Sequence, residues 1–444
     1  MTMVQTRQVE EWPATPIQGW MREHDTDNPN SGYYVLPFTW SIAGQVDWQC
    51  FAAAFEAVCM RHPVLRAALR RGVDSWLQTV RSYSEVPVRF RDVAGLSGEP
   101  LDKLLQDSYD EYCRKPFRLT EEPPIRVLVL QLAEEGLVLG AFHQAACDIE
   151  SMAVFISEFS LLYEAYLNGT EPDLPGPGLA FGEYASRVWP TRRSQEVKNL
   201  AFWREKLAGV DLRCCLPVDF PDAVAAPVGP AEYVKIGAQP TARAVHTLAL
   251  QTRCSEHSIL LAALTMMLAN RSGQSSFVLS CPVTLRRSAE LLRTFGPMTD
   301  LMWLRLDVAE STSLVENSRV VFRGILEALA HPCPVDVVAR QVGTGTPYGP
   351  LTGPNLQCQN FPAERVANPE WVTSSVKVNQ VMPVYLLTGP VDTPFWLDLT
   401  IAGERVQPDT DYSLVYRSDL FRPETARAMA GEIEATILGE ALHG

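Results

Sequence analysis

The sequence lacks several features that mark common classes of protein. No run of about 18 apolar residues occurs, and the first twelve residues contain no apolar stretch of signal-peptide length. A positive charge balance is also lacking, because the formal net charge is −14. An acidic surface repels nucleic acid and anionic membranes. We therefore expect a cytosolic protein with no nucleic-acid partner and no membrane partner.

Patterns of metal sites and of common hydrolases are missing as well. The ten cysteines are scattered, with no CxxC pair and no histidine at metal-ligand spacing. We expect reduced, mostly buried thiols, no metal and no bound cofactor. Ser280 precedes Cys281 without a GxSxG pattern around it, which disfavours a hydrolase of that kind.

The length and composition indicate a folded protein with two cores. The chain has 444 residues, of which 46% are apolar and 20% charged. Gly and Pro are concentrated over 168–178 and interrupt helix and strand there. We predict an N-terminal lobe over 1–170, a linker over 171–180 and a C-terminal lobe over 181–444. Because β-rich runs alternate with helical patterns in both halves, each lobe should be of mixed α/β type.

The segment that points to chemistry is 143–148, HQAACD. It follows two β-rich runs, 125–131 and 136–142, which predict a hairpin, and a helical pattern begins after Asp148. His143 and Asp148 should therefore lie on a loop between a strand and a helix, where reactive groups are often found.

Several segments across most of the chain resemble the motifs of nonribosomal peptide synthetase condensation domains, in the order of that family. They are TPIQ at 15–18, RHPVLR at 61–66, HQAACD at 143–148, FGEYA at 181–185 with Trp189, FWREKLAG at 202–209, PVTLR at 282–286 and FGPMTDL at 295–301. The resemblance implies two chloramphenicol acetyltransferase-like lobes in a V-shaped pseudo-dimer, with a central tunnel and the His143 motif at the junction.

The resemblance also implies the partners. Peptidyl or acyl carrier proteins would bring tethered groups to the tunnel on a phosphopantetheine arm, which acts as substrate carrier, and an amine or alcohol would accept the group. A tunnel provides proximity and excludes water. Since no adenylation or carrier domain fits in this length, we expect the carrier proteins to act in trans.

Three positions depart from the family pattern. Gln144 stands where the HHxxxDG motif has its second His, and a carboxamide cannot exchange a proton near neutral pH as an imidazole does. Ile149 replaces the Gly after Asp148, and Asp300 replaces an Asn that in the family lies across the tunnel from the His motif. Gln144 and Asp300 are our candidate catalytic residues, and we expect Ile149 and Met298 to line the tunnel.

The resemblance assigns structural roles to the other motif residues. His143 would support the loop by hydrogen bonding, and Asp148 would pair with Arg286 from the other lobe. Removing one partner of such a buried pair costs about 3–5 kcal/mol. Cys147 is best explained by packing, because cysteine is among the most buried residue types.

The altered positions leave two interpretations each. Gln144 either orients a substrate amide or carbonyl, with proximity and electrostatics supplying the rate, or marks the loss of acyl transfer. X-domain relatives, which lack the second His and recruit other enzymes to a carrier protein, are a precedent for the loss. Asp300 is either a general base with a pKa raised by burial or a solvated or salt-bridged replacement for Asn.

These features predict a free-standing condensation-domain-like protein of natural-product biosynthesis. It would transfer a carrier-bound acyl or aminoacyl group and form an amide or an ester bond at a modified centre. One alternative is a non-catalytic recruitment scaffold. Another is an enzyme of the same fold that performs elimination or cyclisation with Asp300 as the base.

Overall fold

The chain forms two compact units in the computed structural model. Unit 1 comprises Met1–Thr191, Leu285–Met298 and Arg365–Thr388, and unit 2 comprises Arg192–Thr284, Thr299–Glu364 and Gly389–Gly444. The structure describes residues 10–73, 75–210, 215–226, 229–237, 239–308, 312–342, 356–362, 376–380, 392–393, 397–403 and 411–443.

The boundaries of the two units along the chain differ from those of the predicted lobes. Residues 171–180 form neither helix nor strand, but they belong to unit 1, together with two segments from the second half of the chain. We call the first of these, 285–298, the crossing segment. The V-shaped arrangement and the tunnel stay predictions.

Unit 1 is built on a five-stranded sheet with the order β12-β2-β7-β6-β5. Its strands are β2 (Val35–Ala43), β5 (Val88–Asp92), β6 (Ile125–Gln131), β7 (Glu135–His143) and β12 (Val376–Gln380). The predicted hairpin is confirmed as β6 and β7, and β7 pairs with β2 on its other side. His143 is the last residue of β7, opposite Val35 of β2.

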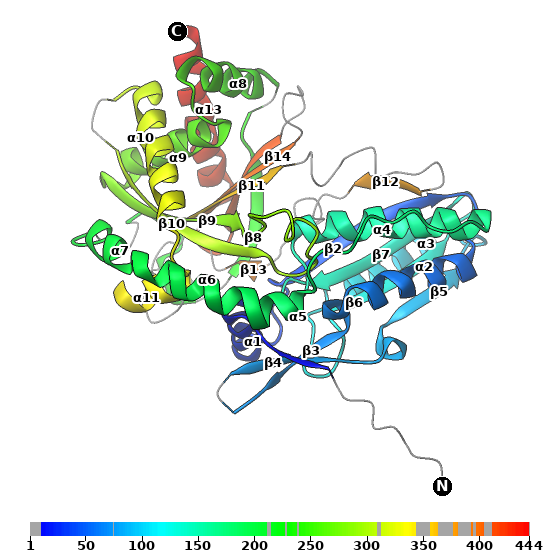
Figure 1. Cartoon of the computed structure of the whole chain (residues 1–444). Coiled ribbons are helices and arrows are strands. Elements are labelled where there is room, and N and C mark those ends of the chain that lie inside the picture. The colour runs from blue at the N-terminus through cyan, green and yellow to red at the C-terminus, as the bar shows by residue number, and fades with distance from the viewer. Residues whose placement is uncertain are drawn as a thin grey trace. The chain divides into compact units, whose positions relative to one another are not determined.

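The alternation of side chains along β6 gives this sheet two apolar faces. Val127 packs in a cluster with side chains of α2 (Trp48–Arg61) and α4 (Ile149–Asn168). Leu128 points the other way, into a cluster with α3 (Glu99–Tyr109). Figure 1 shows these helices beside the sheet. A sheet covered on both faces holds the end of β7 in a rigid setting.

A second, three-stranded sheet and several short helices complete unit 1. The sheet has the order β1-β4-β3, and β4 lies between its two neighbours. These elements are β1 (Glu11–Pro13), β3 (Ala67–Arg71), β4 (Trp76–Val80), α1 (Pro16–Asp27), α5 (Phe181–Glu183), the 3-10 helices Pro63–Arg66 and Tyr83–Glu85, and the π-helical turns Asp110–Arg114 and Tyr184–Val188. The next helix, α6 (Trp189–Glu196), begins in unit 1 and ends in unit 2.

Unit 2 is built on a seven-stranded sheet with the order β10-β9-β11-β14-β15-β8-β13. The strands are β8 (Gly229–Lys235), β9 (Ser276–Thr284), β10 (Thr299–Asp307), β11 (Leu356–Pro362), β13 (Asp392–Thr393), β14 (Leu397–Gly403) and β15 (Asp411–Arg417). The helices are α7 (Leu200–Lys206), α8 (Gln239–Thr252), α9 (Glu256–Ser272), α10 (Leu314–Ala330), α11 (Val335–Val342) and α13 (Pro423–His443), with 3-10 turns at Val197–Asn199 and Pro221–Ala225. Each unit is therefore of the predicted mixed α/β type.

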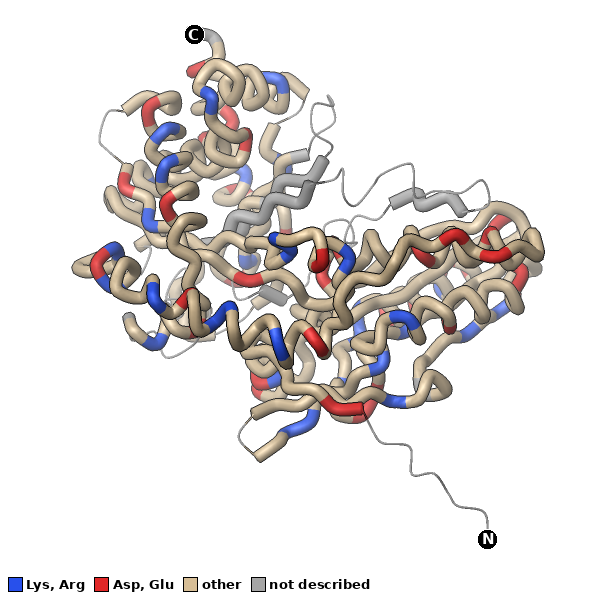
Figure 2. The backbone as a smooth tube through the Cα atoms, in the orientation of Figure 1, with Lys and Arg blue, Asp and Glu red and all other residues tan. Residues whose placement is uncertain are grey.

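The helix α9 is the centre of the helical layer of unit 2. It packs against α8, α10 and α13, and every residue from Ser258 to Thr265 is buried. None of the described helices is both long and apolar enough to cross a membrane. Positions of acidic and of basic residues are interspersed along the backbone of each unit (Figure 2).

Candidate functional site

The loop after β7 is fastened to the crossing segment by an ion pair between Asp148 and Arg286. The guanidinium donates to both carboxylate oxygens, from Nη1 to Oδ2 at 2.7 Å and from Nη2 to Oδ1 at 2.9 Å. The Arg286 side chain has no exposed surface. Its Nε and Nη2 also donate to the carbonyl oxygen of Thr294, at 3.2 and 3.0 Å. The predicted ion pair is therefore present, and Arg286 also shapes its own segment.

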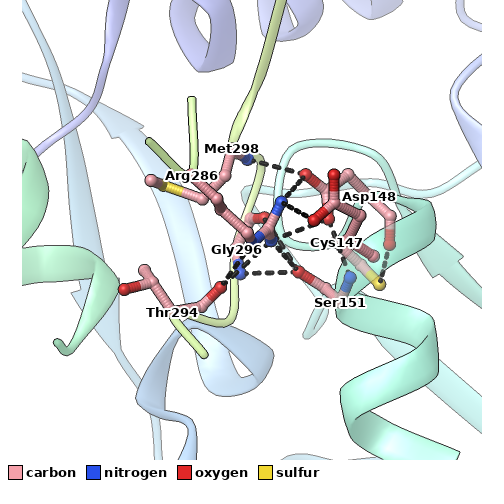
Figure 3. A network of polar contacts seen from close by, with 8 residues as sticks. Cys147, Asp148, Ser151, Arg286, Thr294, Gly296 and Met298 are labelled. Atoms are coloured by element: carbon pink, nitrogen blue, oxygen red, sulfur yellow. Dashed lines mark hydrogen bonds and ion pairs between the residues drawn. The ribbon is translucent and has the colours of Figure 1, made fainter. Parts of the chain in front are cut away.

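Backbone groups complete the network around Asp148 (Figure 3). Its carboxylate caps α4 by accepting the Ser151 N–H at 2.8 Å, and it accepts the Met298 N–H at 3.0 Å. The Ser151 hydroxyl donates to the Gly296 carbonyl at 2.9 Å. Gly296 has φ of +152°, and an added Cβ would lie 2.3 Å from the ring of Phe181, so glycine is required there.

Arg286 does not come from the unit that the prediction gave for it. Arg286 was expected to reach Asp148 from the other lobe, but the crossing segment belongs to the same unit as Asp148. The strands β9 and β10 of unit 2 end and begin at either side of that segment, so the chain leaves unit 2 to supply Arg286 and then returns. The ion pair is therefore internal to unit 1.

The environment of Asp148 keeps it ionised. Burial by itself raises the pKa of this carboxyl, but the charge and hydrogen bonds of Arg286, with those of Ser151, hold the pKa below its ordinary value. All of its described contacts serve the loop, the cap of α4 and the crossing segment. The arrangement suits a residue that holds structure together.

A second carboxylate of unit 1 also holds the crossing segment. Glu158 of α4 is 1% exposed and accepts from His62 Nε2 at 2.8 Å, lies 3.0 Å from Arg61 Nε, and accepts from Arg293 at 3.2 Å. The ring of His62 stacks on Phe295 with centroids 4.7 Å apart. The RHPVLR segment is thus linked to the crossing segment through α4.

Both ring nitrogens of His143 have hydrogen-bond partners within the protein. Its side chain is 1% exposed, Nδ1 accepts the Ala145 N–H at 2.9 Å, and Nε2 lies 2.9 Å from Oδ2 of Asp25 in α1. The rings of Tyr34 and Phe117 lie against it, with centroids 5.8 Å away in each case. These contacts agree with the expected supporting role and leave no ring nitrogen for a substrate.

Helix α1 contacts the loop at a second point. Gln18, the last residue of TPIQ, is 1% exposed and donates from Nε2 to the carbonyl of Ala145 at 2.8 Å and to Gln78 Oε1 at 3.1 Å. The same side chain accepts the Thr15 N–H at 2.9 Å as part of the capping box of α1. The glutamine of this motif therefore connects the start of α1 to the loop.

Gln144 differs from the other polar residues of the loop. Its N–H donates to the Tyr34 carbonyl at 2.9 Å, which fixes its backbone. The side chain is partly exposed and, among the residues that the structure describes, makes no hydrogen bond. A carboxamide can both donate and accept hydrogen bonds.

The remaining loop positions have simple explanations. Ile149 is the first residue of α4 and has no positive φ, so a β-branched side chain fits there without strain. Cys147 is fully buried, and burial and the charge of Asp148 raise the pKa of its thiol, which makes it a poor nucleophile. Met298 is 0% exposed within the apolar core of unit 1. A tunnel-lining role for Ile149 or Met298 stays a prediction.

Asp300 lies in unit 2, near the start of β10 and opposite Val283 of β9. It is partly buried, and its Oδ1 accepts the N–H of Leu301 at 2.8 Å. In the described part of the chain no cation lies within ion-pair distance of this carboxyl. The nearby arginines hold other carboxylates: Arg192 pairs with Glu196 at 2.5 Å, and Arg193 pairs with Asp336 at 2.7 Å.

These surroundings favour the protonated form of Asp300. Burial raises its pKa to about 6, and the charges of Glu196 and Asp336 act in the same direction. The N–H of Leu301 and the charge of Arg192 lower the pKa but do not offset burial. The pKa of this carboxyl therefore lies closer to neutral pH than that of an ordinary aspartate.

No group of His, Cys, Asp or Glu side chains in the described residues is arranged to hold a metal ion. No disulfide joins the cysteines whose side chains the structure describes, and Cys214 and the side chain of Cys358 lie outside the described residues.

Comparison with known proteins identifies the family. The family model described as "Condensation domain" matches residues 8–443. The chain belongs to the condensation-domain family. It is similar to chondramide synthase cmdD of Chondromyces crocatus, with 24% identity over 415 residues, which is 91% of this chain but 10% of that protein. The chain thus spans a small part of this curated relative, as it does of other matched synthases.

Solved structures confirm the predicted chloramphenicol acetyltransferase-like fold of condensation domains. The X-domain from teicoplanin biosynthesis superposes with a TM-score of 0.80 at 21% identity, covering 97% of this chain and 95% of that one. A four-domain nonribosomal peptide synthetase bound to AMP and glycine gives a TM-score of 0.81 at 16% identity, covering 98% of this chain and 33% of that one. At this identity the likeness establishes the fold and leaves the chemistry to the residues.

Some residues of this condensation-domain site were not predicted from the sequence. Asp25 and Ser151 carry no motif that would mark them, and Glu158 lies on the helix face of the apolar Phe155 and Leu162. Gln18 belongs to the TPIQ motif, but the motif alone does not indicate which residues Gln18 contacts. The only sequence signal for any of these contacts is Glu158 itself, because an acidic residue at an apolar helix position is usually buried with an ion-pair partner.

Proposed function

We propose that the chain acts on an acyl or aminoacyl group tethered to the phosphopantetheine arm of a carrier protein and transfers it to an amine or alcohol, forming an amide or ester bond. Condensation domains generally are acyltransferases of nonribosomal peptide synthesis. In this proposal Gln144 orients the substrate by hydrogen bonding and Asp300 takes up the proton of the attacking group.

The observation that carries the proposal is the state of the loop 143–148. His143 and Asp148 are buried and fully bonded, whereas the Gln144 carboxamide is partly exposed and has no described partner. A carboxamide in this setting can bind a carbonyl or an N–H, but it cannot remove a proton.

Asp300 supports the proton-transfer part of the proposal. General-base catalysis works best when the pKa of the base is near the working pH, and burial raises the pKa of Asp300 to about 6. The proton would move from the attacking amine or hydroxyl to the carboxylate as the new bond to the carbonyl carbon forms. The C–S bond of the thioester would then break, and the leaving thiolate of the phosphopantetheine arm would take this proton from Asp300, which regenerates the carboxylate.

The proposal is tested by intact-mass analysis of acyl-loaded carrier proteins from the same pathway, incubated with candidate acceptors. Asp300→Asn should lower turnover by about 100-fold or more, the range of general-base catalysis, and should leave carrier-protein binding unchanged. Asp307→Asn is a matched control, because it removes the same charge from an exposed position of the same strand. Gln144→Ala should reduce turnover less than Asp300→Asn.

The variants also separate the alternatives. Restored or faster bond formation by Gln144→His would indicate a weakened acyltransferase, and loss of product would indicate other chemistry at this centre, such as elimination or cyclisation. Full turnover by Asp300→Asn would exclude Asp300 as the base. If no variant alters the product of the pathway and all bind the carrier protein, the chain is a recruitment scaffold.

A further inference from the structure

We infer that Asp25 of α1 is a positioning residue, which selects one tautomer of His143 and thereby fixes the backbone that presents Gln144. Its effect on turnover rests on the proposed function, whereas its effect on the loop does not. Asp25 is separated from His143 by 118 positions in the sequence, and the hydrogen bond between them is 2.9 Å long.

The contacts of His143 allow only one neutral tautomer. The Ala145 N–H donates to Nδ1 at 2.9 Å, so this nitrogen carries no proton. Nε2 must then carry the proton, and it donates to Oδ2 of Asp25. Because the ring is 1% exposed, water cannot replace either partner without moving the loop.

Asp25 is suited to accept this bond. Burial by itself raises the pKa of Asp25, but the hydrogen bond that Asp25 accepts from His143 holds the pKa below its ordinary value, with a smaller contribution from His24. Its second oxygen lies 3.9 Å from Nδ1 of His24, on the same helix. An ionised carboxylate accepts hydrogen bonds more strongly than a neutral group does, so Asp25 favours the Nε2–H form.

The tautomer determines the course of the loop. Three successive N–H groups are bonded: Gln144 to the Tyr34 carbonyl, Ala145 to Nδ1 of His143, and Ala146 to the His143 carbonyl, each at 2.9 Å. The opposite tautomer would place a proton on Nδ1 facing the Ala145 N–H, and two donors cannot bond each other. Asp25 therefore acts on Gln144 through His143.

The test follows the tautomer directly, by NMR of protein labelled with ¹⁵N-histidine at pH 8. The chain has seven histidines, and His143→Gln assigns the signals of His143. Three variants are compared with the wild type: Asp25→Leu, which removes the acceptor, Asp25→Asn, which keeps an oxygen there, and Asp27→Asn. The last is the matched control, because Asp27 is exposed on the same helix and makes no described contact with His143.

The wild type and Asp27→Asn should show His143 protonated on Nε2 alone. Asp25→Leu should populate the Nδ1–H form and speed hydrogen exchange of the peptide containing Ala145. Asp25→Asn should restore the wild-type tautomer. Where acyl transfer is measured, Asp25→Leu should lower kcat by about 10- to 100-fold, as expected for a displaced reactive group, and Asp25→Asn should recover most of it.

Two results would overturn the inference: a wild-type His143 protonated on Nδ1, or an Asp25→Leu variant with the wild-type tautomer and exchange rate. If Asp25→Leu does not fold, the wild-type tautomer and the Asp25→Asn spectrum decide. The tautomer shift without any acyl transfer in the wild type would refute the proposed function and leave the positioning role of Asp25 intact.

Discussion

Asp148 in unit 1 is buried and Asp300 in unit 2 is partly buried, and their surroundings shift the pKa values of the two carboxyls in opposite directions. Asp148 accepts both branches of the Arg286 guanidinium and two backbone N–H groups. Asp300 accepts one N–H, from the next residue, and no described cation pairs with it. The pKa of Asp148 is lowered, and burial raises that of Asp300 to about 6.

The same chemical group is thus held ionised by its partners in one unit and has no described cation partner in the other. A carboxylate whose lone pairs are all occupied has no capacity for a substrate and contributes to stability. A carboxyl buried without a cation costs stability when ionised and holds its proton more tightly. Pairing, more than burial, separates the two.

The largest effect is expected from Asp148→Ala. This change removes the closer carboxylate from the fully buried guanidinium of Arg286 and leaves only Glu150, at 3.9 Å, which should lower the free energy of unfolding by about 3–5 kcal/mol. Urea unfolding at pH 7 measures the loss. Gln144→Ala is the control, since its side chain makes no described hydrogen bond, and similar losses for both variants would contradict a structural role for Asp148.

Lowering the pH should remove the advantage of the Asp148 carboxylate. Because its folded pKa lies below the unfolded value of about 3.9, its stabilisation is complete above that value and is lost as the pH falls through the folded pKa. The stability gap between wild type and Asp148→Asn should be constant from pH 7 to 5 and narrow below about pH 4. A gap that narrows already between pH 7 and 5 would mean that the pKa is not lowered.

Asp300→Asn should change stability in the opposite direction to Asp148→Asn, because it should make the protein more stable. The folded pKa of Asp300 is about 6, above the unfolded value of about 3.9, so the folded state holds the extra proton and the wild type loses stability as the pH rises between these values. The variant should therefore be more stable than the wild type at pH 8, by up to about 3 kcal/mol at roughly 1.4 kcal/mol per pKa unit, and similar to it at pH 4. Thermal unfolding at both pH values checks this, and a variant less stable at pH 8 would contradict it.

The smallest effect concerns Glu158, the other buried carboxylate of unit 1. Arg293→Ala removes a partly exposed partner, while His62 and Arg61 continue to neutralise Glu158. The loss should be about 1 kcal/mol or less, and urea unfolding is the measurement. A loss as large as that of Asp148→Ala would show that the crossing segment depends on Glu158 as much as on Arg286.

Local pattern predicted much of the fold. The hairpin of β6 and β7 follows from two β-rich runs around a turn, and α9 follows from a long apolar segment. The loop between β7 and α4 follows from the change in period at Asp148. These features depend on residues close in sequence, so their physical causes are visible there.

The contacts that complete the site could not be predicted in the same way. The hydrogen bond of Asp25 to His143 joins residues 118 positions apart, and no periodicity relates them. The crossing segment lies between two paired strands of unit 2, and such a connection would ordinarily remain with its strands. The pairing of Arg286 with Asp148 was expected from the family resemblance alone, since no local rule selects one arginine among many.

The contrast between the two carboxyls is tested by a ¹³C NMR titration of protein labelled at the aspartate carboxyl groups. Asp148→Asn and Asp300→Asn assign the two signals. We expect Asp300 to titrate with a pKa of about 6. Asp148 should stay ionised until the pH falls below the ordinary pKa of an aspartate. An Asp300 signal that titrates near pH 4, or an Asp148 signal that titrates at or above its ordinary pKa, would contradict the division of roles between these two residues.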